Sequence, residues 1–175
     1  ESNFKFNLPF EYLIPNLILA ILVADELNVS KKEIQNALNE INQLELNIDY
    51  FENSKYKVLN DSYNSNLKGF KYAIDFSQQV KAPKKILLNS GIKELGKESK
   101  KIHQDLYTQA AEVFDEIILN ANYLKKYIPN KHKEKFTVIS SSKKMQEYLN
   151  QIPKSTYIAI EGRNFSNVVP FLKQK

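Results

Sequence analysis

Apolar residues divide the chain into two differently patterned parts. Between Pro15 and Leu27 they occupy every face of a presumed helix, which is typical of a helix that other structure covers. A second helix is expected after Ser30, because Glu33 completes a capping box ahead of an apolar stripe. Residues 1–45 are therefore predicted to form a helical hairpin that cannot bury its apolar surface alone.

From residue 46 onward, short strands alternate with amphipathic helices. Two strands are expected around Tyr50 and Val58, with a turn at Asn53 and Ser54 between them. Four further apolar runs, each preceded by a helical segment, indicate strands at residues 86–88, 117–119, 136–139 and 157–160. The predicted fold class is α/β: a Rossmann-like, mostly parallel sheet of about six strands with helices on both faces, preceded by the helical hairpin.

The loops at the carboxyl ends of the predicted strands are polar. They begin at Asn60, Asn89, Asn120, Ser140 and Glu161, and two of them contain glycine. Because open parallel sheets bind ligands beyond this edge, we expect the functional site there.

Composition and charge exclude several classes of function. The net charge is +5, but the lysines are scattered among glutamates and Arg163 is the only arginine, so no nucleic-acid partner is expected. The chain has no cysteine, which excludes disulfides and thiolate chemistry. The apolar run at residues 13–23 contains Pro15 and is too short to span a bilayer. A cytoplasmic protein without a membrane partner is expected.

The most informative stretch is residues 60–66, with the sequence Asn-Asp-Ser-Tyr-Asn-Ser-Asn, between a predicted strand and a predicted helix. Asn, Asp and Ser favour turns and helix caps, because their side chains bond to nearby backbone groups. Composition alone therefore leaves two interpretations open: a ligand-binding loop, or a loop that caps the helix beginning near Leu67.

The order of these residues resembles the Mur ligase family, whose carboxy-terminal domain carries Asp-Ser-Tyr-Asn-x-Asn after a strand. The matching positions are Asp61, Ser62, Tyr63, Asn64 and Asn66. Leu67 stands where the family usually has proline. Residues 85–96 resemble the strand and Glu-Leu-Gly loop of the family, and His103 falls where a histidine often follows.

The resemblance implies an ATP-dependent amide ligase of three domains. The first would hold a UDP-sugar, the central one ATP, and the third would close over both while presenting the amine. Tyr63 and Asn64 are most like the member that adds D-alanyl-D-alanine to UDP-N-acetylmuramoyl-tripeptide through an acyl phosphate. ATP and Mg²⁺ would then be cofactors of the full-length enzyme, and the UDP-muramoyl peptide and D-alanyl-D-alanine its substrates.

The chain is expected to be one piece of such an enzyme. Gly-x-x-x-x-Gly-Lys-Ser/Thr, the loop that cradles a triphosphate, occurs nowhere in the sequence. Residues 1–45 would be the tail end of the central domain and residues 46–175 the carboxy-terminal domain. The missing amino-terminal and central domains would be its partners, and the fragment alone would bind no cofactor tightly and be inactive.

The resemblance also implies roles for individual residues. Asp61 would accept hydrogen bonds from the ribose hydroxyls of ATP, and Asn64 would lie near the adenine. Support of this loop would fall to Ser62, Tyr63 and Asn66. Possible contacts to the amine substrate are the loops that contain Gly91, Glu94, Gly162 and Arg163. No catalytic residue and no metal ligand is expected within the chain itself.

Two segments depart from the family pattern. Leu46 and Asn47 stand where Gly-Arg is usual, and residues 161–164, Glu-Gly-Arg-Asn, replace Lys-Gly-Ser-Arg, which reverses a charge. The alternative interpretations are a folylpolyglutamate-type or other amino-acid ligase domain, and a stand-alone flavodoxin-like binding module.

The two histidines receive structural interpretations. His103 lies on a predicted helix, and we expect it to be packed or at the surface and not to act as a base. The expected apolar stripe of that helix is Ile102, Leu106, Ala110 and Val113. His132 lies between two lysines, so we expect it in a solvated loop.

Overall fold

The computed structural model describes residues 3–5, 14–41, 49–63, 65–165 and 167–174. The chain forms two compact units, Glu1–Leu46 and Asn47–Lys175. Within the described residues, no helix is long and apolar enough to cross a membrane.

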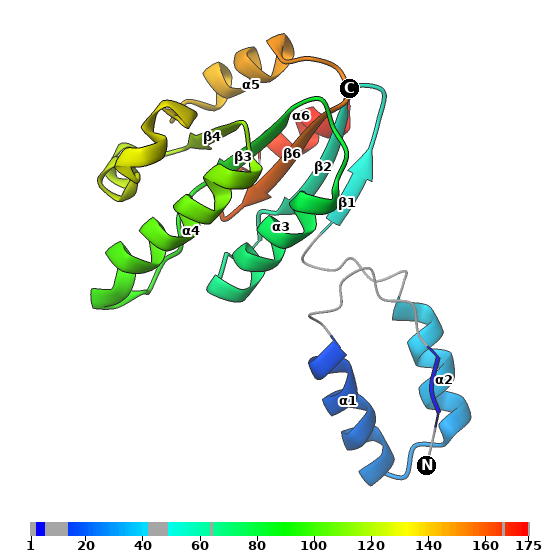
Figure 1. The fold of residues 1–175 in the computed structure, drawn as a ribbon. Helices are drawn as coiled ribbons and strands as arrows, with labels where there is room; N and C mark the ends of the chain where they lie inside the picture. The colour runs from blue at the N-terminus through cyan, green and yellow to red at the C-terminus, as the bar shows by residue number, and fades with distance from the viewer. Residues whose placement is uncertain (1–2, 6–13, 42–48, 64, 166, 175) are drawn as a thin grey trace. The chain divides into compact units, whose positions relative to one another are not determined.

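The first unit contains two helices, α1 (Ile14–Glu26) and α2 (Lys31–Glu40), drawn in blue in Figure 1. The predicted capping box is confirmed, because Glu33 N donates to Ser30 Oγ while Ser30 N donates to the Glu33 side chain. The buried core of the unit is small and consists of Leu17, Ile34 and Leu38.

The second unit is built on a six-stranded sheet, which confirms the predicted α/β class. Its strands are β1 (Asp49–Glu52), β2 (Tyr56–Asp61), β3 (Lys85–Asn89), β4 (Glu116–Leu119), β5 (Phe136–Val138) and β6 (Thr156–Glu161). Their order across the sheet is β1-β2-β6-β3-β4-β5. β1 pairs antiparallel with β2, through the predicted turn, and every other pair is parallel.

Helices cover both faces of the sheet, as the alternating pattern predicts (Figure 1). One face carries α3 (Leu67–Gln79) and α4 (Ser99–Val113), and the other carries α5 (Ser142–Gln151) and α6 (Val168–Lys173). Met145 and Leu149 of α5 and Leu172 of α6 belong to one buried cluster with alternate strand residues. Short 3-10 helices at Gly96–Glu98, Asn122–Tyr127 and Asn130–Lys135 complete the connections.

The position of β6 defines where a ligand can bind. The chain passes from β2 through α3 to β3, and the last strand then returns between these two. In open α/β sheets, the loops separate at such a reversal of strand order and leave a crevice at the carboxyl edge. The ends of β2, β6 and β3 form this edge.

The buried face of α4 differs from the expected stripe. The buried residues are His103, Leu106, Tyr107, Ala110 and Ala111, and the predicted members Ile102 and Val113 are only partly buried. His103 and Tyr107 can occupy this buried face because their polar atoms form hydrogen bonds there. Ile92 N donates to His103 Nε2, and Tyr107 Oη donates to Asn89 Oδ1. The packed interpretation of His103 is thus confirmed.

The expectation for His132 is wrong. The residue is buried in the 3-10 helix Asn130–Lys135, with its Nε2 3.1 Å from Glu112 Oε1. Lys131 and Lys133 on either side are exposed. Flanking charges therefore did not predict the direction of the imidazole, because neighbouring side chains of a tight turn point to different sides.

Candidate functional site

Three polar side chains lie side by side at the carboxyl ends of the central strands. The strand register pairs Asp61 of β2 with Glu161 of β6, and Glu161 in turn with Asn89 of β3. All three are buried, with exposed fractions of 3%, 0% and 0%. Paired residues of parallel strands face the same side of a sheet, here the side that α3 and α4 cover. The edge thus carries a buried polar row.

Burial disfavours the ionised form of both carboxyl groups in this row. Burial raises the pKa of Asp61 to about 6. Burial, and then the nearby charge of Asp61, raise the pKa of Glu161 well above its ordinary value, against a smaller opposing effect of the hydrogen bond from Ser65 Oγ. Glu161 Oε1 has no hydrogen-bond partner among the residues that the structure describes.

Asn89 fixes the start of the next loop. Its Oδ1 accepts from Gly91 N and from Tyr107 Oη, both at 2.8 Å, and its Nδ2 donates to the Glu161 carbonyl oxygen. That carbonyl also accepts from Ser90 N at 3.0 Å. The loops after β3 and β6 are therefore tied together through one buried amide.

The motif loop packs against the start of α3. Asn66 is the N-cap of this helix, and its Oδ1 accepts from Gly69 N at 2.9 Å. A Cβ atom on Gly69 would lie 3.0 Å from Asp61 Oδ2, so glycine lets the first turn approach the carboxylate closely. Among the described residues, none donates a hydrogen bond to the Asp61 carboxylate, so Asp61 does not cap the helix.

The other members of the motif have different surroundings. Ser62 N donates to Asn60 Oδ1 at 3.3 Å, and the side chain of Tyr63 is exposed. Arg163 Nε donates to the Tyr63 carbonyl oxygen at 3.1 Å, which joins the loops after β2 and β6. Asn64 lies outside the described residues, as do Leu46 and Asn47.

A pocket of about 410 Å³ lies between the loops that follow the strands of this row, β2, β3 and β6. Its lining brings together four residues singled out in the sequence: Asn66, Gly91, Glu94 and Arg163. Asp61 does not line the pocket. Ser65, Ser90 and Lys93 line the pocket as well, and the sequence analysis did not single them out. Their position in loops at the carboxyl edge of the sheet could have identified them. The pocket lining therefore contains residues with hydroxyl, amide, carboxylate and cationic side chains.

Gly162 borders this site without lining it. A Cβ atom there would lie 2.1 Å from Ser90 Oγ, and its φ of +95° is one that side chains rarely adopt. Glu94 also holds a positive φ, +66°, although it carries a side chain. Strained backbone of this kind is concentrated at functional sites, where surrounding structure imposes it.

Residues 91–97 match the first seven positions of a phosphate-binding loop, Gly-x-x-x-x-Gly-Lys, between a strand and a helix. The match ends at Glu98, where a hydroxyl residue is required. The backbone N–H groups of residues 90–92 also point inward, to the Glu161 carbonyl oxygen, Asn89 Oδ1 and His103 Nε2. The three N–H groups at the start of this loop are therefore not free to bind phosphate.

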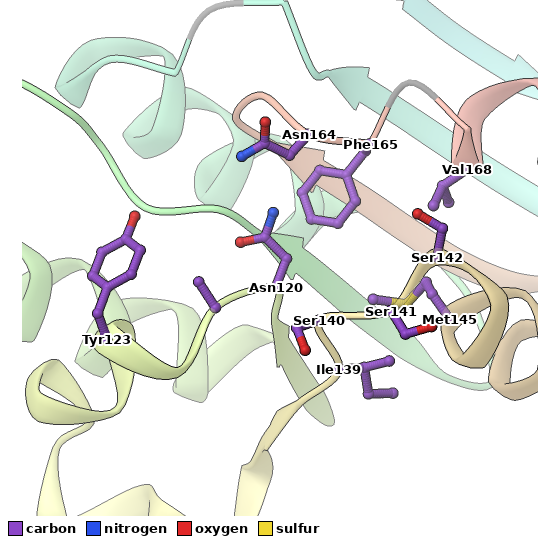
Figure 2. A pocket seen from close by; sticks show the side chains of 11 residues that line it. Asn120, Tyr123, Ile139, Ser140, Ser141, Ser142, Met145, Asn164, Phe165 and Val168 are labelled. Carbon is purple, nitrogen blue, oxygen red and sulfur yellow. The ribbon is translucent and has the colours of Figure 1, made fainter.

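A second pocket of about 330 Å³ lies at the ends of β4 and β5 (Figure 2). Figure 2 shows Asn120 and Phe165 near its middle, with Tyr123 on one side and Ser142 and Met145 of α5 on the other. Tyr123 connects the two pockets, because its hydroxyl donates to the Ser90 carbonyl oxygen at 3.2 Å. The sequence marked the loops at Asn120 and Ser140 as polar but gave them no role.

Comparison with known proteins finds similarity to Mur ligases. No family model matches the chain. It is 29% identical over 161 residues to the UDP-N-acetylmuramoyl-tripeptide–D-alanyl-D-alanine ligase of Borreliella burgdorferi, a match that spans 87% of the chain and 34% of that relative. The chain is thus similar in sequence to part of a Mur ligase. It spans about a third of the length of the curated relative that it matches.

Solved structures agree on the fold. MurF from Acinetobacter baumannii superposes with a TM-score of 0.80 at 20% identity, over 99% of the chain and 40% of that protein. MurF from Thermotoga maritima, solved in complex with ADP, gives a TM-score of 0.62 at 15% identity, over 88% of the chain and 35% of that protein. The second unit thus has the fold of a Mur ligase carboxy-terminal domain.

Proposed function

We propose that the chain is the amine-presenting part of an ATP-dependent ligase that adds D-alanyl-D-alanine to UDP-N-acetylmuramoyl-tripeptide. The observation that carries this proposal is the placement of the Asp61–Asn66 motif at the reversal of strand order, on a fold shared with MurF. Similarity to the Borreliella burgdorferi ligase supports the choice of substrates.

The rest of the enzyme would supply what this chain lacks. In the proposal, the hairpin α1–α2 is the tail end of a central ATPase domain, and a further domain binds the UDP-sugar. The lack of a complete Gly-x-x-x-x-Gly-Lys-Ser/Thr loop in the sequence supports a phosphate site elsewhere, and the chain alone would be inactive. Among the described residues no group of three or more His, Cys, Asp or Glu could hold a metal ion, so Mg²⁺ would be held by the other domains and the phosphates.

The pocket between the loops that follow β2, β3 and β6 has groups for both a nucleotide and an amine substrate. A dipeptide carries an ammonium and a carboxylate at opposite ends. Glu94 provides a negative charge for the first, and Lys93 and Arg163 provide positive charges for the second. The motif side of the pocket, at Ser65 and Asn66, would face the nucleotide. The loops of Gly91 and Gly162 would set the distance between the two.

Asp61 would accept hydrogen bonds from the ribose hydroxyls of ATP, with Asn64 near the adenine. Its 3% exposure sets a condition on this role: the carboxylate must gain exposure when the nucleotide binds. Its pKa of about 6 fits a group that nucleotide binding would convert fully to the accepting, ionised form.

In the assembled enzyme, this domain would act by positioning. ATP would supply the phosphoryl group that activates the tripeptide carboxylate as an acyl phosphate. The residues of this chain would hold the amine beside that centre when the domain closes. Closure converts an encounter into an intramolecular step and keeps water away from the acyl phosphate.

The substrate assignment is tested by measuring phosphate release from the full-length enzyme with UDP-muramoyl tripeptide and ATP. We expect release with D-alanyl-D-alanine and none with D-alanine or D-glutamate alone. Release with a single amino acid, but not with the dipeptide, would favour a different amino-acid ligase.

The ribose role is tested by Asp61→Ala in the full-length enzyme. Loss of hydrogen bonds to a charged acceptor should raise the Michaelis constant for ATP about tenfold, with little change in that for the dipeptide. Asp75→Ala, which removes an exposed carboxylate from α3, is the matched control. An unchanged constant for ATP would remove the ribose assignment and leave the ligase assignment intact.

A further inference from the structure

The imidazole of His103 is buried beside the loop that follows β3. Its Nε2 accepts a hydrogen bond from Ile92 N at 3.0 Å, and its Nδ1 lies 2.7 Å from the Ser99 carbonyl oxygen. A carbonyl oxygen can only accept, so Nδ1 carries the proton and Nε2 is bare. The two contacts therefore define one neutral tautomer.

Aromatic neighbours hold the ring in this orientation. Tyr127 stacks on it with ring centroids 4.4 Å apart and an interplanar angle of 7°, and Tyr107 meets its edge at 5.7 Å. Ser99 Oγ lies 3.3 Å from Nδ1 and 3.0 Å from the Tyr127 hydroxyl. The imidazole cannot rotate without breaking these contacts.

The charges around the ring favour its neutral form. Burial lowers the pKa of His103, and the positive charge of Lys126 on the Asn122–Tyr127 helix lowers it further, against an opposing effect of the hydrogen bond to Ser99. The titratable neighbours are Tyr107 on α4 and Tyr127 beside Lys126. On the loop itself, Lys93 and Glu94 are exposed.

The bond to Ile92 is one of four that fix residues 90–92. Ser90 N donates to the Glu161 carbonyl oxygen, Gly91 N to Asn89 Oδ1, and Tyr123 Oη to the Ser90 carbonyl oxygen. Of the groups in these four bonds, only the imidazole titrates near neutral pH. A Cβ atom on Gly91 would lie 3.2 Å from Nε2, so backbone and ring are in close contact.

We propose that His103 is the positioning residue of the loop at residues 90–95, and that protonation of its Nε2 releases this loop and with it one wall of the pocket. A protonated Nε2 would face the Ile92 N–H as a second donor, and the bond cannot form between two donors. The inference concerns this chain alone and does not depend on the proposed ligase activity.

The tautomer is tested by nitrogen-15 NMR of the 175-residue chain labelled at histidine. The sequence contains only two histidines, so a His132→Gln variant assigns the remaining ring to His103. We expect a protonated Nδ1 and a bare Nε2 at pH 7.5. A bare Nδ1 with a protonated Nε2 would overturn the proposal.

The release is tested by hydrogen exchange of the Ile92 amide, corrected for the intrinsic pH dependence of exchange. We expect its protection to fall about tenfold or more between pH 7.5 and pH 5, while amides within β3 keep theirs. His103→Phe retains a ring against Tyr127 but no acceptor, so its Ile92 amide should be unprotected at both pH values.

His103→Gln is the matched rescue, because a glutamine amide oxygen reaches near the position of Nε2 and does not titrate. Protection of Ile92 should persist in this variant and no longer depend on pH. Two results would each overturn the proposal: equal pH dependence in His103→Gln and the wild type, or full protection in His103→Phe.

Discussion

Asn89 and Glu161 are neighbours on the same sheet edge and are both fully buried, yet their polar atoms are satisfied very differently. The Asn89 side chain bonds to Gly91, Tyr107 and the backbone of Glu161. The Glu161 side chain has one bond, from Ser65, and one oxygen without a partner among the described residues.

The difference separates framework from site. A buried polar group with all its hydrogen bonds formed stabilises a single arrangement of its neighbours. A buried polar group without a partner instead lowers the stability of the fold, because it has lost its hydrogen bonds to water and gained none in return. Asn89 therefore belongs to the framework of the loops. Glu161, beside Asp61, is the member of the row whose side chain lacks a full set of partners among the described residues.

The largest effect is expected from Asn89→Leu. The change removes the acceptor of the Gly91 and Tyr107 donors and leaves both buried without a partner, so it should lower the free energy of unfolding by about 3–4 kcal/mol. Urea denaturation at pH 7 measures it. A loss below about 1 kcal/mol would mean that water replaces the amide, and Asn89 would not be part of the framework.

Replacing either acid by its amide should raise the free energy of unfolding, in contrast to Asn89→Leu, and the gain should depend on pH. A carboxyl group whose pKa is raised in the folded state stabilises fully below its unfolded pKa, and this contribution is lost as pH rises through the folded value. For Asp61 the window runs from 3.8 to about 6, and a shift of this size corresponds to about 3 kcal/mol.

Asp61→Asn and Glu161→Gln test this behaviour through the difference in unfolding free energy from the wild type at each pH. Both variants should gain stability relative to the wild type as pH rises from 4 to 7. Neutralising Asp61 should also move the pKa of Glu161 toward its ordinary value, because the charge of Asp61 is one cause of its rise, and carbon-13 NMR of the carboxyl group follows this change. Differences that stay constant with pH would show that folding does not raise the pKa of either carboxyl group.

The contact between the two loops is tested by a smaller change. Gly162→Ala places a methyl group against Ser90 Oγ at a positive φ, and should cost about 2–3 kcal/mol. Gly96→Ala is its control, because φ is also positive there but no atom lies within 4 Å, so the cost should be about 1 kcal/mol. Equal costs would attribute the effect to φ alone and remove the steric contact between the loops.

Local patterns predicted much of this molecule. The capping box at Ser30 and Glu33, the turn at Asn53 and the alternation of strands with helices are all written in adjacent residues, and the structure contains them. The roles assigned to the motif residues stay predictions, and the experiments above test them. The two histidines show the limit: His103 proved to be packed, one of the two positions expected for it, whereas the inward direction of His132 was not visible in its lysine neighbours.

The sequence by itself determined the order and kind of the elements, because hydrogen bonding within a helix and the alternation of a strand depend on nearby residues. Only the tertiary structure decided that β6 inserts between β2 and β3, which brings Glu161 beside Asp61 and buries both. Strand order and register depend on packing between residues far apart in the chain. Local periodicity carries no information about those contacts.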